Sequence, residues 1–183
     1  MKELFNRIIE WGSDKGIHDI QFEPLVQIGF LLEELHEVNK EFIAGSTDKA
    51  VGEICDLIVY SVNALMLIKQ VNQLLNLNFK SEKYTELVVN IDVIKQLNMS
   101  IHSIMCNIKC RVSLPITYTH LISNCCRSIN ALGYSPEIAL EETIKKIESR
   151  RGAMNPVTGK WEKFIGQRDI YKPDYSKARL NND

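Results

Sequence analysis

Two short acidic clusters have residue types and spacing that suit cation binding. The first, EELHE, contains Glu33, Glu34 and Glu37, and the second, EICD, contains Glu53 and Asp56. Residues three apart on a helix lie about 60° from each other, so each cluster sets two carboxylates on one helix face. If the two helices pack as an antiparallel hairpin, four carboxylates face one another across the pair.

Asp56 indicates that these acidic residues are more than a solvated helix face. Acidic residues three or four apart on a helix usually face solvent, and that interpretation suits Glu33 and Glu41. Asp56 lies in a segment that is apolar almost all round, 54–68, where an unpaired carboxylate is costly. No lysine or arginine occurs in residues 50–68, so no local counter-ion is available. The sequence therefore predicts a shared divalent cation, and all-oxygen ligation favours Mg²⁺, or Mn²⁺, over zinc.

Helical periodicity dominates the chain and strand-like alternation is nearly absent, so we expect an all-α protein. Cap residues, glycines and prolines divide the chain into expected helices. Their approximate ranges are 2–13, 22–42, 47–75, 81–110, 117–132 and 136–150. The third helix carries EICD and is expected to be central and buried. Turn residues in RRGAMNPVTGKWEKF predict a small hairpin after the last helix.

The bulk properties favour one domain and exclude some partners. The chain has 183 residues, 45% apolar and 25% charged, and a net charge of -1, which gives no basic excess for nucleic acid or an anionic membrane. The longest apolar run is too short for a membrane span, and the charged N-terminus has no signal-peptide pattern. We therefore expect a cytoplasmic protein with one domain over 1–170 and a polar, flexible tail over 171–183.

Two other metal sites are weaker alternatives. The spacing of Glu33 and His36 matches one half of a di-iron motif, but the second Glu-x-x-His that such a site needs is missing. Four of the five cysteines could surround zinc, although no CxxC spacing occurs and small buried hydrophobes are the favoured interpretation. These four are Cys106, Cys110, Cys125 and Cys126.

The two acidic clusters, in this order, resemble the sequence motif of the all-α nucleoside triphosphate pyrophosphohydrolases, the MazG-like superfamily. That motif is EExxE followed by ExxD. The gap here is the fifteen residues 38–52, which lies within the range of that family. IIEWGSDKGI (8–17) is similar to the opening helix and turn of the family, and IKKIESRRGAMNPVTGKWEK (144–163) to its closing segment. The resemblance covers about 5–68 and 134–164.

Two single residues extend this resemblance and two features depart from it. Gln27 and Asn63 match a glutamine and an asparagine found in related members. Phe30 stands where many members carry a lysine, which puts one expected phosphate or carboxylate contact in doubt. Residues 70–132 have no counterpart in the family pattern, and we expect them to form an extra central helical hairpin.

The resemblance implies an enzyme that uses Mg²⁺, or Mn²⁺, to cleave a nucleoside or deoxynucleoside triphosphate to the monophosphate and pyrophosphate. From the chemistry of such a site we expect that Glu34 or Glu37 acts as the general base and that Glu33 orients a metal ligand. A homodimer or dimer of dimers is also implied. The metal ligands that it implies are Glu34, Glu37, Glu53 and Asp56. The substrate contacts that it implies are Gln27, Asn63, Lys146 and Arg150.

Several of these residues have a structural alternative. Lys146 and Arg150 also suit a solvated basic turn that complements the helix dipole. Asn63 also suits a buried amide bonded to the backbone. Trp11 and Phe30 suit the core better than stacking on a base. The alternative functions are a phosphoribosyl-ATP pyrophosphohydrolase-like enzyme and a non-enzymatic helical interaction module.

Overall fold

The computed structural model confirms the all-α class. Its described part contains six α-helices and one two-stranded antiparallel sheet. The described residues are 1–70, 72, 89–108, 113–155, 157, 161–164, 166 and 170–180. The helices are α1 (Lys2–Asp14), α2 (Pro24–Ile43), α3 (Thr47–Leu67), α4 (Val89–Asn107), α5 (Leu114–Ala131) and α6 (Pro136–Glu148).

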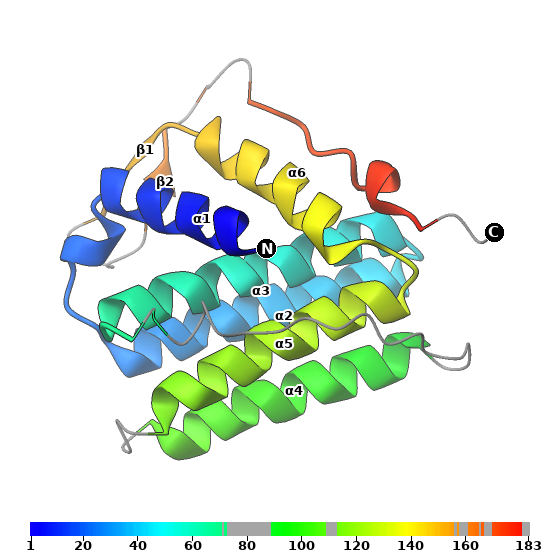
Figure 1. Ribbon diagram of the computed structural model, residues 1–183, viewed down its shortest axis with the longest axis horizontal. Helices are drawn as coiled ribbons and strands as arrows, with labels where there is room; N and C mark the ends of the chain where they lie inside the picture. The colour runs from blue at the N-terminus through cyan, green and yellow to red at the C-terminus, as the bar shows by residue number, and fades with distance from the viewer. Residues whose placement is uncertain are drawn as a thin grey trace.

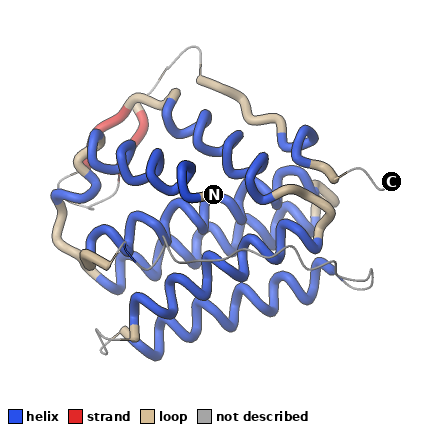
Figure 2. Tube along the Cα trace, viewed as in Figure 1, coloured by secondary structure: helices blue, strands red, loops and turns tan. Residues whose placement is uncertain are grey.

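Helix α3 is the centre of the fold, as its apolar sequence predicts. Thirteen of its 21 residues are buried. It packs against α2 and α5, while α1 and α6 lie across another side of it (Figure 1, Figure 2). Helix α4 contacts both α5 and α2, which closes a four-helix arrangement around the core. By length and composition α3 also meets the criteria for a membrane-crossing helix, but 72% of that window is buried inside the bundle.

The expectation that the third helix continues to about residue 75 is wrong. Helix α3 ends at Leu67, and Lys69 adopts a left-handed backbone with φ of 57°. The amide of Gln70 then bonds to the carbonyl of Leu65, which closes the last turn as a Schellman motif. Because a lysine seldom adopts this conformation, the sequence contains no usual signal for the stop.

Helices α4 and α5 pack side by side in the region that has no counterpart in the family pattern (Figure 1). The expected start of α4 near residue 81 lies outside the described residues, as does its expected end at residue 110. Helix α5 begins at Leu114 because Pro115 fits its first turn, where no backbone N–H is needed. The idea that this pair is an addition to a smaller bundle stays a prediction.

The predicted hairpin follows α6 and is confirmed. Strand β1 (Gly152–Met154) pairs antiparallel with β2 (Trp161–Lys163), and Gly152 is opposite Lys163. A Cβ at Gly152 would lie 2.1 Å from the backbone oxygen of Glu162 and 2.6 Å from the Trp161 ring. Glycine therefore lets Trp161 fold closely over its own hairpin.

The expectation of a flexible tail is wrong for residues 171–180, which pack on the bundle, while 181–183 lie outside the described residues. Tyr175 and Ala178 are buried, and the hydroxyl groups of Tyr175 and Thr143 are 2.9 Å apart. Two backbone hydrogen bonds tie this segment to the loop before α6 at Gly133 and Ser135. The composition of the segment is polar overall, so its few anchoring residues produce no hydrophobic pattern.

A buried carboxylate holds the other end of this segment. Glu142 is 2% exposed, and it accepts hydrogen bonds from the Asp174 amide at 2.9 Å and from the Tyr171 hydroxyl. Burial acts to raise the pKa of Glu142, but these donors and Lys145 outweigh it and hold that pKa at about 2. Glu142 is therefore a structural anion that ties the C-terminal segment to α6.

Gly52 is expected to be necessary for the docking of Tyr175. A Cβ at Gly52 would lie 2.6 Å from a ring carbon of Tyr175. We expect Gly52→Ala to lower the free energy of unfolding by about 1–3 kcal/mol, because the ring must move in a packed site. Urea unfolding measures this change. Gly29→Ala is the matched control, since no atom of the described residues outside its own helix backbone lies within 4 Å of its new Cβ. It should raise stability by about 1 kcal/mol. Equal effects in the two variants would contradict the docking argument.

Candidate functional site

A cleft of about 430 Å³ lies between α2 and α3 and is bounded by the end of α6, the hairpin and the turn after α1. Every site residue predicted from the sequence lines this cleft. These residues are Gln27, Glu33, Glu34, Glu37, Glu53, Asp56, Asn63, Lys146 and Arg150. The helical spacing of the two motifs was therefore sufficient to place their residues on one shared surface.

Two rows of side chains form the long walls of the cleft. The rows are Gln27, Phe30, Glu34 and Glu37 on α2, and Glu53, Asp56, Tyr60 and Asn63 on α3. Members of a row are three or four residues apart and so share a helix face. Because the two helices form an antiparallel hairpin, the acidic ends of the rows meet at one end of the cleft and the amides lie at the other. The rings of Phe30 and Tyr60, with centroids 5.3 Å apart, mark the middle.

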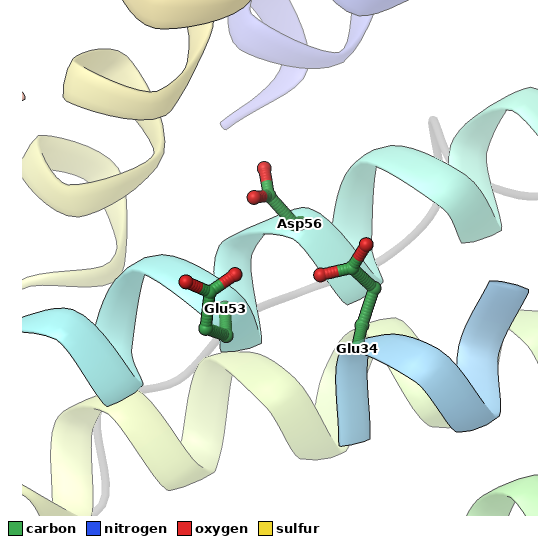
Figure 3. Close-up of side chains that lie close together, drawn as sticks. All are labelled: Glu34, Glu53 and Asp56. Carbon is green, nitrogen blue, oxygen red and sulfur yellow. The ribbon is translucent and has the colours of Figure 1, made fainter. Parts of the chain in front are cut away.

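Three carboxylates converge at the acidic end. Each of Glu34, Glu53 and Asp56 offers an oxygen, and these atoms all lie within 4.8 Å of one another. Figure 3 shows the side chain from α2 and the two from α3 turned toward a common space. Across the described parts of the chain, no other group of three or more histidine, cysteine or acidic side chains meets this criterion. The arrangement could hold a divalent cation.

Glu37 lies in the cleft wall but outside this cluster. Its carboxylate accepts a hydrogen bond from Lys40 Nζ at 2.7 Å, and 36% of the side chain is exposed. The hydrogen bond with Lys40 lowers the pKa of Glu37. The structure thus brings together three of the four predicted carboxylates. Glu37 stays apart because it pairs with Lys40, three residues away on its own helix.

Asp56 has a counter-ion from a helix that is distant in sequence. Lys146 Nζ lies 2.6 Å from Asp56 Oδ2, and the two side chains are 13% and 15% exposed. The absence of a local counter-ion in residues 50–68 therefore does not leave Asp56 unpaired, because α6 brings Lys146 from 90 residues away. One ammonium group offsets only one of three carboxylates, so the cluster retains an excess of negative charge.

Burial and the excess negative charge raise the pKa values of two carboxyl groups in the cluster. Burial, together with the charges of Asp56 and Glu53, raises the pKa of Glu34 to about 8. Burial and the charge of Asp56 also raise the pKa of Glu53. Without a cation, the cluster therefore takes up protons near neutral pH. A divalent cation would displace those protons, and the all-oxygen donor set fits Mg²⁺ or Mn²⁺.

These pKa shifts predict how stability depends on pH. A raised carboxyl pKa means that the folded state keeps a proton that the unfolded state releases above pH of about 4.5. We therefore expect the free energy of unfolding to fall as the pH rises from about 5 to 8.5. Urea unfolding in EDTA measures this dependence.

Glu34→Gln and added Mg²⁺ test whether the carboxylate cluster causes this pH dependence of stability. Glu34→Gln should flatten it, because glutamine cannot titrate, and Mg²⁺ should restore stability at the high-pH end by binding the folded state alone. A stability that rises over the same pH range in EDTA would contradict the charge assignment.

The amide end of the cleft is tied to the turn after α1. Asn63 is 5% exposed and donates from Nδ2 to the Val59 carbonyl at 3.0 Å. Its Oδ1 lies 2.8 Å from Nε2 of His18, whose Nδ1 lies 3.0 Å from Ser13 Oγ. Asn63 thus has the backbone bond of the structural alternative and also lines the cleft. His18 was not predicted as a site residue, because a single histidine in a turn belongs to no periodic pattern.

The two basic residues assigned to phosphate both lie in the cleft wall, whereas their neighbour Lys145 does not. Lys145 Nζ is 3.1 Å from Glu142 and faces the C-terminal segment. Within the described residues, the guanidinium of Arg150 has no hydrogen-bond or ion-pair partner. The Lys146 side chain is only 13% exposed, which rules out the alternative in which it lies in a solvated basic turn.

Two aromatic side chains that the sequence did not predict as site residues, Tyr60 and Trp161, complete the cleft. Trp161 packs edge-on against Trp11, with ring centroids 5.8 Å apart. Both indole nitrogens are buried, and neither has a hydrogen-bond partner among the described residues. Tyr60 could have been found by continuing the α3 row one turn beyond Asp56. Trp161 had no such signal, because the hairpin rather than helical spacing brings it to the cleft.

The alternative metal sites gain no support from the described residues. Cys125 and Cys126 are buried while Cys106 is exposed, and Cys110 lies outside the described residues. His36 is exposed and does not line the cleft.

The cleft combines a cluster of three carboxylates that could hold a cation, two basic groups and aromatic walls. This combination suits a polyanion that carries an aromatic ring. Comparisons of the chain with protein-family models, with curated proteins and with solved structures gave no match.

Proposed function

We propose that this protein is a Mg²⁺-dependent nucleotide pyrophosphohydrolase that cleaves a nucleoside or deoxynucleoside triphosphate to the monophosphate and pyrophosphate. The observation that carries the proposal is the convergence of Glu34, Glu53 and Asp56 beside Lys146 and Arg150 in one cleft. A non-enzymatic interaction module has no use for largely buried carboxylates. The resemblance in motif order and spacing adds support from the sequence.

The phosphate end of the cleft has groups for each part of this reaction. A Mg²⁺ or Mn²⁺ ion bound there would neutralise phosphate charge and polarise the reacting phosphoryl group. Glu34, Glu53 and Asp56 hold the cation, while Lys146 and Arg150 donate charge-assisted hydrogen bonds to phosphate oxygens. Glu34 or Glu37 accepts the proton of the attacking water.

The rest of the cleft accommodates the nucleoside. The acidic and amide ends of each row are about two helical turns apart, which is about 10 Å along the axis. Phosphate, sugar and base in sequence span a comparable length. Trp11, Phe30 and Tyr60 form apolar walls for the ring, and Gln27 and Asn63 offer amides to its polar edge.

We further propose a homodimer or dimer of dimers that acts in the cytoplasm. Exposed apolar side chains on α2 support a partner surface. These include Leu25, Leu32 and Ile43, which are 78%, 44% and 81% exposed.

Product identification tests the proposed reaction. The protein is incubated with Mg²⁺ and a panel of ribo- and deoxyribonucleoside triphosphates and phosphoribosyl-ATP, and the products are separated by ion-exchange chromatography. We expect a monophosphate and pyrophosphate, and no products in EDTA. Orthophosphate release would contradict the cleavage position, and turnover of phosphoribosyl-ATP alone would support the related enzyme. A lack of turnover with every nucleotide would favour the interaction module.

A further inference from the structure

The hydrogen bonds of Asn63 permit only one orientation of its side-chain amide. The main-chain carbonyl of Val59 lies 3.0 Å from one amide atom, and a carbonyl only accepts hydrogen bonds. That atom is therefore the nitrogen, and Oδ1 faces His18 Nε2 at 2.8 Å. Exchanging nitrogen and oxygen would set two acceptor oxygens against each other.

The amide in turn determines the tautomer of His18. Because Oδ1 of Asn63 accepts, Nε2 of His18 carries the proton. In the neutral ring Nδ1 then accepts from the hydroxyl of Ser13, 3.0 Å away. Hydrogen bonds thus connect the end of α1, the following turn and α3, and each has an assigned donor.

Gly12 allows this arrangement to form. A Cβ at Gly12 would lie 2.3 Å from Asn63 Oδ1 and 2.6 Å from His18 Nε2. Glycine inside a helix disfavours the helix relative to alanine. The backbone of α1 therefore approaches the two side chains more closely than any other residue would permit, which encloses the amide from a third side.

The position of this amide suits the recognition of a base. Asn63 lines the cleft two helical turns beyond Asp56, about 10 Å along α3, and Tyr60 lies between them. With phosphates at the acidic end, the base of a nucleotide lies near Asn63. Uracil and cytosine differ in the order of donors and acceptors on one edge, as do hypoxanthine and adenine. With both hydrogen bonds in place the amide is held in one orientation and fits one order. Without His18 only the Val59 carbonyl restrains the amide, which can then turn toward the other order.

We propose that His18 is a positioning residue that sets base selectivity by locking the amide of Asn63. This inference rests on the proposed function, because it assumes that a nucleotide occupies the cleft. His18 acts through Asn63 and not on the reacting phosphates. Its loss therefore changes which base is preferred far more than it changes the chemical step.

The test compares kcat/KM within two pairs of substrates, dUTP with dCTP and ITP with ATP. We expect the wild-type protein to prefer one member of at least one pair by about 100-fold or more, since unpaired polar groups strongly disfavour the wrong partner. In His18→Leu this ratio should fall about 10-fold or more, mainly through a higher KM for the preferred base. His18→Gln, whose amide N–H can still donate to Asn63, should retain most of the selectivity.

His36→Leu is the matched control, because His36 is exposed on α2 and does not line the cleft. It should leave the ratio unchanged. An unchanged ratio in folded His18→Leu, an equal loss for both members of each pair, or no preference in the wild type would overturn the inference. If His18→Leu does not fold, Ser13→Ala provides the comparison, since it removes the Nδ1 partner alone and should lower the ratio by a smaller factor.

The tautomer gives a readout that does not depend on turnover. Nitrogen-15 NMR of the neutral His18 ring, in the wild-type protein without nucleotide, should place its proton on Nε2 rather than on Nδ1. Protonation at Nδ1 alone would overturn the locked amide. If the wild type hydrolyses no nucleotide, the proposed function fails, and the inference on selectivity fails with it. If the wild type hydrolyses nucleotides and His18→Leu keeps the same kcat/KM ratio, the inference on selectivity fails while the proposed function stands.

Discussion

Asp56→Asn and Glu34→Gln are each expected to abolish Mg²⁺-dependent hydrolysis without unfolding the chain. Asp56 and Glu34 contribute two of the three carboxylates whose oxygens lie within 4.8 Å of one another. Each substitution keeps the shape of the side chain and removes an anionic oxygen that the cation requires. We expect rates to fall by about 1,000-fold or more, beyond the 10- to 100-fold that is typical of losing a residue that only supports a ligand.

Three measurements separate this effect from misfolding. Steady-state kinetics measures the loss of turnover, calorimetry measures Mg²⁺ binding, and circular dichroism measures the thermal transition. Because the pKa of Glu34 is raised to about 8, the glutamine variant resembles the protonated wild-type side chain and should be at least as stable near neutral pH. Asp14→Asn is the matched control, since Asp14 is exposed on α1 outside the cleft. Full activity in either cluster variant would contradict the proposed site.

Lys146→Met is expected to move metal affinity and nucleotide affinity in opposite directions. Lys146 Nζ lies 2.6 Å from Asp56 Oδ2, so its ammonium group occupies an oxygen that a cation would also use. Removing that positive charge should tighten Mg²⁺ binding about 10-fold in the absence of nucleotide, which is about 1.4 kcal/mol. The same substitution removes a phosphate donor, so KM for the triphosphate should rise about 10-fold or more.

Lys145→Met supplies a matched control for this prediction. The two lysines are adjacent in sequence, but Lys145 contacts Glu142 and Tyr171 and does not line the cleft. Calorimetry without nucleotide measures the metal affinity of both variants, and initial rates measure KM. Weaker Mg²⁺ binding in Lys146→Met would contradict competition between the ammonium group and the cation. An unchanged KM would contradict the phosphate contact.

Local sequence signals were sufficient for most helix boundaries. Ser135 accepts a hydrogen bond from the Ile138 amide, and Pro136 fits the first turn of α6, as the cap and proline pattern predicts. Such signals act between residues a few positions apart, so they can be identified without knowledge of the fold. The end of α3 had no such signal, because its left-handed residue, Lys69, is not a glycine.

The cleft was predictable to the extent that it depends on helical spacing. Glu34 and Asp56 face each other because both lie on regular rows of helices joined by a short turn. Glu37 belongs to the same row, yet its carboxylate pairs with Lys40 and stays outside the cluster. The choice between these partners depends on side-chain positions that the spacing does not determine.

The sequence by itself determined the all-α class, the central position of α3 and the acidic faces of α2 and α3 that line the cleft. Those properties follow from periodicity and end signals within single helices, which are local. Only the tertiary structure decided that Lys146 neutralises Asp56, that His18 orients Asn63, and that Tyr175 docks at Gly52. The first two pairs are 90 and 45 residues apart, and all three depend on how separate segments pack against α3.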